Sequence, residues 1–249
     1  MKLLGTLKKQ DWILIAPMII LALYLIIRLV DKSSIIHSFP LDFANDLSSH
    51  LAKLHFLSEY GFHAIVPNWY FGMDYVLFRS YPPGWYFFAL PLYKILENVQ
   101  LATYISIISI YVLSFIAILF IGRQNGFSKL RSSAYFLLLY ANPISIGYLL
   151  RLGKPPELTG WLIGLIVLGI LLYYKNNKFD WKFYSLSFML SIWVMSNFTS
   201  LIACLPLFLG FFLILKNRTK IHFIIMGFFA ILLASPWLFP FISHILAGG

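Results

Sequence analysis

The sequence predicts an all-α fold, a polytopic transmembrane helical bundle with one long polar loop on its outer side. Hydrophobic residues make up 60% of the 249-residue chain and charged residues 11%, and the mean hydropathy is +0.82. Soluble domains are about 45–50% apolar and about 25% charged. The apolar runs are too long, and alternate too little, for the strands of a membrane barrel. The composition therefore excludes a soluble globular domain.

Eight apolar segments are candidates for helices. The first is interpreted as a retained span, because no small-residue cleavage site of a signal peptide follows it. The run from 183 to 215 is too long for one span and is interrupted at 196–200 by Ser-Asn-Phe-Thr-Ser, which predicts a helical hairpin of two short spans. The eight segments are 12–30, 84–96, 99–121, 132–150, 158–174, 183–197, 199–215 and 221–246.

Basic residues predict the orientation of these segments. Twelve of the 19 lysines and arginines fall in four clusters, which the positive-inside rule assigns to the cytoplasm. All four clusters lie on one side if 84–96 stays at the outer interface, where its prolines and aromatic residues suit it. This gives about seven spans in a single transmembrane domain, residues 1–249, of a multi-pass cell-membrane protein with a cytoplasmic N-terminus. The clusters also account for the net charge of +10 without nucleic acid as a partner.

A polar stretch, Ile36 to Pro83, interrupts the apolar sequence and forms most of the predicted external loop at residues 31–83. It holds four of the nine acidic residues and four of the six histidines. Cys204, the only cysteine, lies in an apolar run, so no disulfide can form within the chain. We therefore expect any chemistry to lie in the polar stretch.

The first part of the polar stretch predicts an amphipathic helix. Asp42, Asp46, His50 and Lys53 follow at intervals of four, four and three, which places them on one helical face. The sequence predicts that this face points outward, with leucines in the interface on the other. The polar face has two interpretations. It is simply solvated, or Asp46 and His50, one turn apart, bind a divalent metal ion such as Mg²⁺ or Mn²⁺.

Two further pieces carry candidate binding residues. Trp69, Arg79 and Tyr81 are typical of a surface that binds sugar or phosphate, or of an aromatic belt at the membrane interface. Arg151 and Lys154 lie between two spans on the predicted outer side, against the positive-inside bias. Ionisable groups in such places are functional candidates, and lysine and arginine bind phosphate well. The simpler interpretation of this loop is an ion pair between Arg151 and Glu157.

The order of these motifs resembles a known family. Asp46-x-x-x-His50, Pro67-x-Trp69, Tyr81-Pro-Pro and Gly153-x-Pro-Pro-Glu157 follow one another as in the prokaryotic membrane proteins labelled 6-pyruvoyl-tetrahydropterin synthase-related. Those proteins resemble the GT-C superfamily of glycosyltransferases, which use polyprenyl-phosphate-linked sugars. The resemblance covers residues 12–170, and beyond them extends only to the hydrophobic topology. The adjacent acidic pair of many members is absent here.

The resemblance implies a catalytic or metal-binding acid in the first outer loop and cations beside a lipid phosphate. Membrane lipid and a polyprenyl-phosphate-linked sugar would be the partners. The implied roles are as follows: Asp46, Asp42 and His50 catalytic; Arg79, Tyr81, Trp69, Arg151, Lys154 and Glu157 substrate-binding; Asp46 and His50 binding metal.

Two other functions remain open from the sequence. A small-molecule transporter would place polar groups and broken helices at the membrane midplane, whereas the charges here gather near one surface. A non-catalytic assembly or lipid-binding subunit would need none of the chemistry. The enzyme hypothesis makes the stronger demand, because it requires the loop around Asp46 to meet the loop around Lys154.

Overall fold

The chain folds into two compact units of interleaved sequence in a computed structural model, which describes residues 9–38, 46–62, 65–70, 73–79, 81–146, 152–175 and 177–246. One unit, called unit 1, comprises residues 1–47 and 108–154, and unit 2 comprises residues 48–107 and 155–249. A single domain spanning the whole chain stays a prediction.

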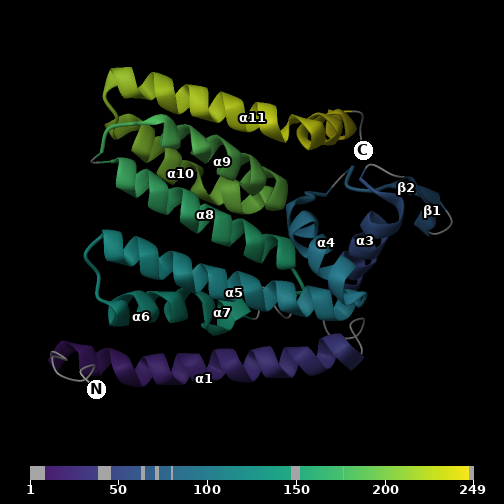
Figure 1. Ribbon diagram of the computed structural model, residues 1–249, viewed down its shortest axis with the longest axis horizontal. Helices are drawn as coiled ribbons and strands as arrows, with labels where there is room; N and C mark the ends of the chain where they lie inside the picture. Colours follow the sequence, from purple (N-terminus) through teal and green to yellow (C-terminus); the bar gives the residue numbers. More distant parts are fainter. Residues whose placement is uncertain are drawn as a thin grey trace. The chain divides into compact units, whose positions relative to one another are not determined.

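Unit 1 is built around a long first helix. Helix α1 (Lys9–Ser38) packs along α6 (Lys129–Tyr140), which follows the C-terminal half of α5 (Val99–Gln124) after a short turn (Figure 1). Residues 13–34 of α1 are long and apolar enough to cross a membrane, and only 6% of the window is buried. The exposed isoleucines and leucines of α1 suit contact with lipid.

The predicted span at 132–150 is wrong as a continuous helix. Helix α6 ends at Tyr140, and a separate short helix, α7 (Pro143–Ile146), follows. Pro143 cannot donate a backbone hydrogen bond and disfavours helical geometry at Asn142. Asn142 satisfies both ends of the break: its Nδ2 donates to the carbonyl oxygen of Leu138 at 2.7 Å, and its Oδ1 accepts from the amide of Ser145 at 2.9 Å.

Unit 2 holds most of the polar stretch and the C-terminal helices. Its elements are the main part of α3 (Leu47–Tyr60), β1 (Ile65–Tyr70), β2 (Met73–Val76), α4 (Gly84–Leu96), the start of α5, α8 (Pro155–Tyr174), the 3-10 turn η2 (Trp181–Tyr184), α9 (Ser185–Ser196), α10 (Phe198–Ile214) and α11 (Asn217–Leu246).

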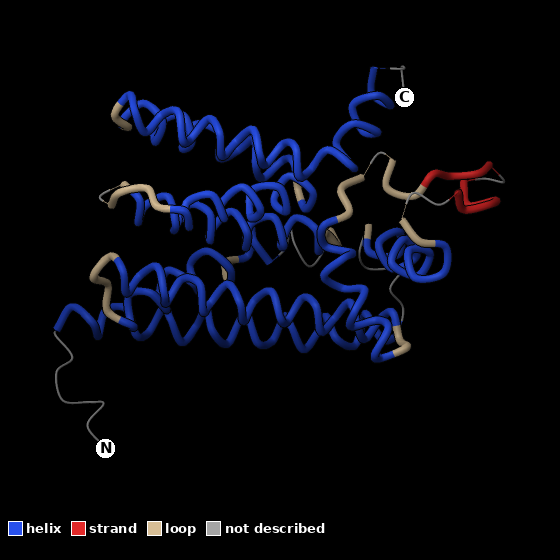
Figure 2. Tube along the Cα trace, turned by 45° about the horizontal axis from the view of Figure 1, so that its top comes forward, coloured by secondary structure: helices blue, strands red, loops and turns tan. Residues whose placement is uncertain are grey.

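The strands form an antiparallel hairpin that pairs Ile65 with Val76 and Val66 with Tyr75 (Figure 2). The sequence prediction named only helices for this loop, so the hairpin is a correction. β-branched and aromatic residues in both segments favour strands.

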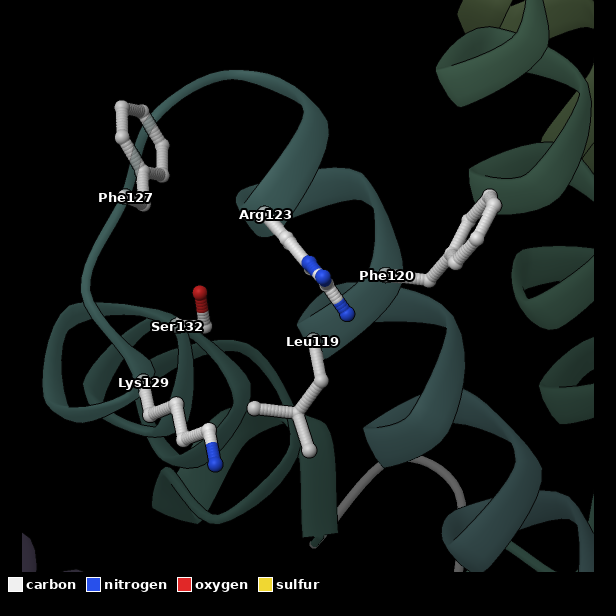
Figure 3. A pocket seen from close by; sticks show the side chains of 6 residues that line it. All are labelled: Leu119, Phe120, Arg123, Phe127, Lys129 and Ser132. Atoms are coloured by element: carbon white, nitrogen blue, oxygen red, sulfur yellow. The ribbon is translucent and has the colours of Figure 1, made fainter.

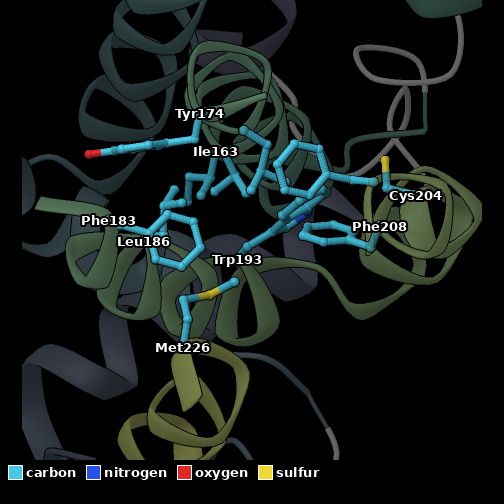
Figure 4. Close-up of a cluster of buried hydrophobic side chains, with 11 residues drawn as sticks. Ile163, Tyr174, Phe183, Leu186, Trp193, Cys204, Phe208 and Met226 are labelled. Atoms are coloured by element: carbon cyan, nitrogen blue, oxygen red, sulfur yellow. The ribbon is translucent and has the colours of Figure 1, made fainter. Parts of the chain in front are cut away.

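The core of unit 2 lies among α8, α9, α10 and α11 (Figure 4). Trp193 is fully buried at its centre, and its Nε1 donates to the Ser200 hydroxyl at 2.8 Å. Gly164 of α8 packs so closely on the Trp193 ring that a Cβ there would overlap it. The predicted hairpin at 183–215 is confirmed as a pair of helices, since Asn197 separates α9 from α10 and its side chain accepts from the Ser200 amide at 2.6 Å. That the two helices are spans stays a prediction.

Four helices in the described part of the chain are long and apolar enough to cross a membrane: residues 13–34, 99–124, 155–174 and 219–246. The shorter apolar helices α9 and α10 have 12 and 17 residues. The all-α fold and the multi-pass membrane character are therefore confirmed, and seven spans stay a prediction. Helix α4, at 13 residues, is shorter than the about 20 needed to cross.

Candidate functional site

Asp46 and Lys154, more than a hundred residues apart in sequence, meet in unit 1. The Asp46 Oδ2 lies 4.0 Å from the Lys154 Nζ, and the side chains are 48% and 32% exposed, respectively. The predicted meeting of the two loops is confirmed for this pair. A half-exposed ion pair contributes only about 0.2–1 kcal/mol to stability, so both groups remain accessible to a ligand.

The backbone fixes this meeting independently of the side chains. The Asp46 amide donates to the carbonyl oxygen of Leu152 at 3.2 Å. Gly153 follows with φ of +66°, a conformation that favours glycine, and turns the chain between Leu152 and Lys154. Asp46 directly precedes α3, and Lys154 directly precedes α8. The two charged side chains are therefore held at the starts of two helices.

His50 lies in unit 2 and is buried, with 2% of its surface exposed. Its Nδ1 lies 2.5 Å from the hydroxyl oxygen of Tyr86 on α4, and which atom donates depends on the tautomer. The prediction that His50 belongs to an exposed polar face is wrong. The aromatic side chains of the 81–86 segment cover the histidine, which spacing along α3 alone could not reveal.

The rings around His50 form a compact cluster. Its centroid lies 5.3 Å from that of Tyr81, 6.0 Å from that of Trp85 and 5.8 Å from that of Tyr86. The Lys53 ammonium lies 4.5 Å from the centroid of the Tyr81 ring, a cation–π contact. Lys53 and Tyr81 are each half-buried. The cluster thus presents a cation and an aromatic face beside a buried histidine, a combination that suits a sugar ring or a phosphate.

The turn that carries Tyr81 is anchored to the C-terminal helix. The Nε1 of Trp237, on α11, donates to the carbonyl oxygens of Phe78 at 3.0 Å and of Tyr81 at 3.1 Å. Phe78 is fully buried and has a φ of +62°, which is uncommon for a residue with a side chain. The burial of Phe78 and the bonds from Trp237 hold the turn in this conformation.

The start of α4 is anchored to the α9–α10 hairpin. A Cβ at Gly84 would overlap the Ser196 hydroxyl and the backbone of Met195, so only glycine fits this contact. The N-terminal part of α8 makes a similar contact, with Gly160 against Asn197. Within unit 2, the described part of the polar stretch, the turn at 196–200 and the region after Ser235 therefore come together.

The remaining predicted site residues are Arg79, Glu157, Trp69, Asp42 and Arg151. Arg79 is exposed, and Glu157 is half-buried in the first turn of α8. Trp69 belongs to β1, but its side chain lies outside the described structure. Asp42 and Arg151 also lie outside the described residues. The described residues contain no group of three or more histidine, cysteine, aspartate or glutamate side chains arranged to hold a metal. A metal ion at Asp46 and His50 stays a prediction.

Sequence reasoning missed three residues that the structure singles out. Tyr86 and Trp237 carry hydrogen bonds into the polar stretch, and nothing in the local sequence signals either. Lys32 is 5% exposed and lies within the candidate span 13–34. An ionisable residue inside a span is a functional candidate, so its position just beyond the apolar run 12–30 was an available signal.

No family model matches the chain, and no curated protein or solved structure shows significant similarity to it.

Proposed function

We propose that this protein is a membrane glycosyltransferase of GT-C type, which transfers a sugar from a polyprenyl-phosphate donor at the outer face of the cell membrane. The observation that carries the proposal is the Asp46–Lys154 pair. A carboxylate and an ammonium group 4.0 Å apart, both accessible, supply a base and a phosphate-binding cation in one place.

Asp46 and Lys154 have separate roles in the proposed reaction. The acceptor oxygen forms a bond to the anomeric carbon, and its proton passes to the Asp46 carboxylate. The bond between the anomeric carbon and the phosphate oxygen breaks, and its electron pair leaves with the polyprenyl phosphate. Lys154 offsets the charge that develops on the departing phosphate. Binding of the donor would draw Lys154 from the carboxylate and leave Asp46 ready to accept a proton.

The proposal includes the finer topology: seven crossings, a cytoplasmic N-terminus and an external loop at residues 31–83. The basic residues at 123–131 support this orientation through the positive-inside rule. In a Cys204→Ala background, an impermeant thiol reagent added outside should label Ser58→Cys and spare Ser128→Cys. The reverse labelling would overturn the orientation.

The activity can be tested with defined donors. Purified protein in liposomes is offered a panel of polyprenyl-phosphate-linked hexoses and pentoses, and the released polyprenyl phosphate is measured by mass spectrometry. Asp46→Asn should lower the rate by about a hundredfold or more, the range of lost general base catalysis. Lys154→Ala should chiefly raise the KM for the donor.

The control is Glu59→Gln, which removes an exposed carboxylate elsewhere on α3. This variant should turn over like the wild type. If folded protein turns over no donor but still retains polyprenyl phosphate, the chain is a lipid-binding subunit. If Asp46→Asn and Glu59→Gln have equal activity, Asp46 is not the base.

A further inference from the structure

A cationic pocket lies in unit 1, at the turn between α5 and α6. It has a volume of about 630 Å³ and is lined by Leu119, Phe120, Arg123, Phe127, Lys129 and Ser132 (Figure 3). Leu119, Phe120 and Arg123 come from the last turns of the candidate span 99–124, and Lys129 and Ser132 from the first turn of α6. The pocket therefore sits where a membrane span ends.

The pocket has an apolar wall and a cationic mouth. Phe120 and Phe127 are 62% and 42% exposed, so both present large apolar surface outside the protein core. Arg123 and Lys129 are exposed. The segment from Leu119 to Ser132 holds a third cation, Arg131, and no acidic residue. This arrangement suits a ligand with an anionic head and an apolar body.

The turn is built rigidly enough to keep these groups in place. The Phe127 amide donates to the carbonyl oxygen of Gly122 at 2.8 Å, and Gly126 has a φ of +73°. A Cβ at Gly122 would overlap the Ser132 hydroxyl, so glycine lets α5 and α6 approach closely here. Ser128 caps α6 by accepting from the Arg131 amide at 3.2 Å. Arg123 and Lys129 are thus held on two helices that meet at a fixed turn.

Two features of the pocket favour an anion. The first turn of α6 carries Lys129 and Arg131 and no acidic residue. Positive side chains at the positive end of a helix dipole destabilise the helix, and a nearby anion would offset this effect. The Ser132 hydroxyl has no hydrogen-bond partner in the part of the chain that the structure describes, although the residue is only 1% exposed. A phosphate at the mouth would offset the cations, and its oxygens are acceptors for a hydroxyl donor.

A neighbouring pocket serves as a comparison. It lies between α1 and α6, has a volume of about 590 Å³ and shares Phe127. Arg131 is its only charged lining residue, and the others are mainly apolar, including Leu14, Met18 and Leu138. With one cation against two, it is less suited to holding a phosphate.

We propose that the pocket at the α5–α6 turn binds the phosphate head group of an anionic phospholipid from the leaflet that this turn faces. Arg123 and Lys129 contact the phosphate, and an acyl chain lies along Leu119 and Phe120. The apolar wall at the end of a span favours a lipid over a free phosphate compound. The inference does not depend on the proposed glycosyltransferase activity.

The test uses detergent-purified full-length protein and native mass spectrometry. The protein is titrated with phosphatidylglycerol and, separately, with phosphatidylcholine of the same acyl chains. Wild-type protein should retain one phosphatidylglycerol at least about tenfold more tightly than phosphatidylcholine, since each of two cations near an anionic lipid contributes about fivefold. The double variant Arg123→Gln/Lys129→Gln should lose this preference.

The matched control removes two charges from another basic cluster, Lys175 and Lys178, which are also exposed. Lys175→Gln/Lys178→Gln should keep the preference of the wild type, and both double variants should have the same Tm. Equal retention of the two lipids by the wild type would overturn the proposal, as would unchanged retention by the Arg123→Gln/Lys129→Gln variant. Displacement of the lipid by glycerol phosphate at the same concentration would show that the pocket selects a phosphate compound rather than a lipid.

Discussion

The two halves of the predicted site differ in how the protein holds them. In unit 1, Asp46 and Lys154 form a half-exposed ion pair at 4.0 Å. In unit 2, His50 is buried at 2.5 Å from the Tyr86 hydroxyl and surrounded by three aromatic rings. Exposed ion pairs are weak in water, whereas a buried polar pair is costly to break. Asp46 and Lys154 therefore remain accessible to a ligand, whereas His50 has a structural role within unit 2.

Helix α3 carries both a buried and an exposed histidine, each in contact with a tyrosine of α4. A second histidine, His55, lies 3.0 Å from the Tyr93 hydroxyl of α4, but His55 is exposed. The two histidine–tyrosine pairs join the same two helices and differ mainly in burial. They form a natural control for the claim that burial, rather than the contact itself, makes His50 structural.

The largest expected effect is the loss of stability on replacing His50. His50→Ala leaves a cavity and takes from the buried Tyr86 hydroxyl its nitrogen partner, which together should cost about 2–4 kcal/mol. His55→Ala should cost less than about 1 kcal/mol, because water replaces its partner. Free energies of unfolding from a denaturant titration in mixed micelles would compare the two. Equal losses would mean that burial does not distinguish the two pairs.

A smaller effect is expected where α4 joins the α9–α10 hairpin. Gly84→Ala would force a methyl group against Ser196 and Met195, and overpacking of this kind costs about 1–3 kcal/mol. The control is Gly210→Ala on α10, where a methyl group would meet no other atom within 4 Å. Alanine there should be neutral or stabilising by up to about 1 kcal/mol. If both variants unfold at the same denaturant concentration, the close contact at Gly84 is not part of the folded protein.

The fold shows where sequence patterns are informative in this chain. Lys154 could be singled out because a cation on the predicted outer side opposes the positive-inside bias. Its pairing with Asp46 followed from one functional requirement. Asn197 marks the turn of the α9–α10 hairpin because a polar residue interrupting an apolar run is also a good helix cap. In both cases the signal was a residue type in an unfavourable place.

The predictions that were wrong or missing concern features that periodicity and hydropathy do not show. His50 was assigned to an exposed face from its spacing, but its partner Tyr86 is 36 residues away, and no periodicity reports such a contact. The helix break at Asn142-Pro143 was hidden in an apolar run that hydropathy reads as continuous. Trp237 anchors the turn at Phe78 from 159 residues away. Long-range packing decides the positions of His50 and Trp237, and only the folded chain contains it. The break at Asn142-Pro143 is local, and its proline was an available signal in the sequence.

The smallest expected effect is the coupling free energy between Asp46 and Lys154. It also tests most directly the contrast between this half-exposed ion pair and the buried pair of His50 and Tyr86. In a double-mutant cycle with Asp46→Asn and Lys154→Ala, the coupling free energy should be about 0.2–1 kcal/mol. Added salt should reduce it in part, because salt screens exposed charges, with a Debye length of about 8 Å at physiological ionic strength, and screens buried pairs much less. The same cycle measured on donor turnover should deviate far more from additivity, since the two residues act on one reacting centre. A coupling free energy above about 2 kcal/mol that does not change with salt concentration would instead be typical of a buried pair. Asp46 and Lys154 would then be structural residues, and the catalytic base would have to be sought elsewhere in the polar stretch.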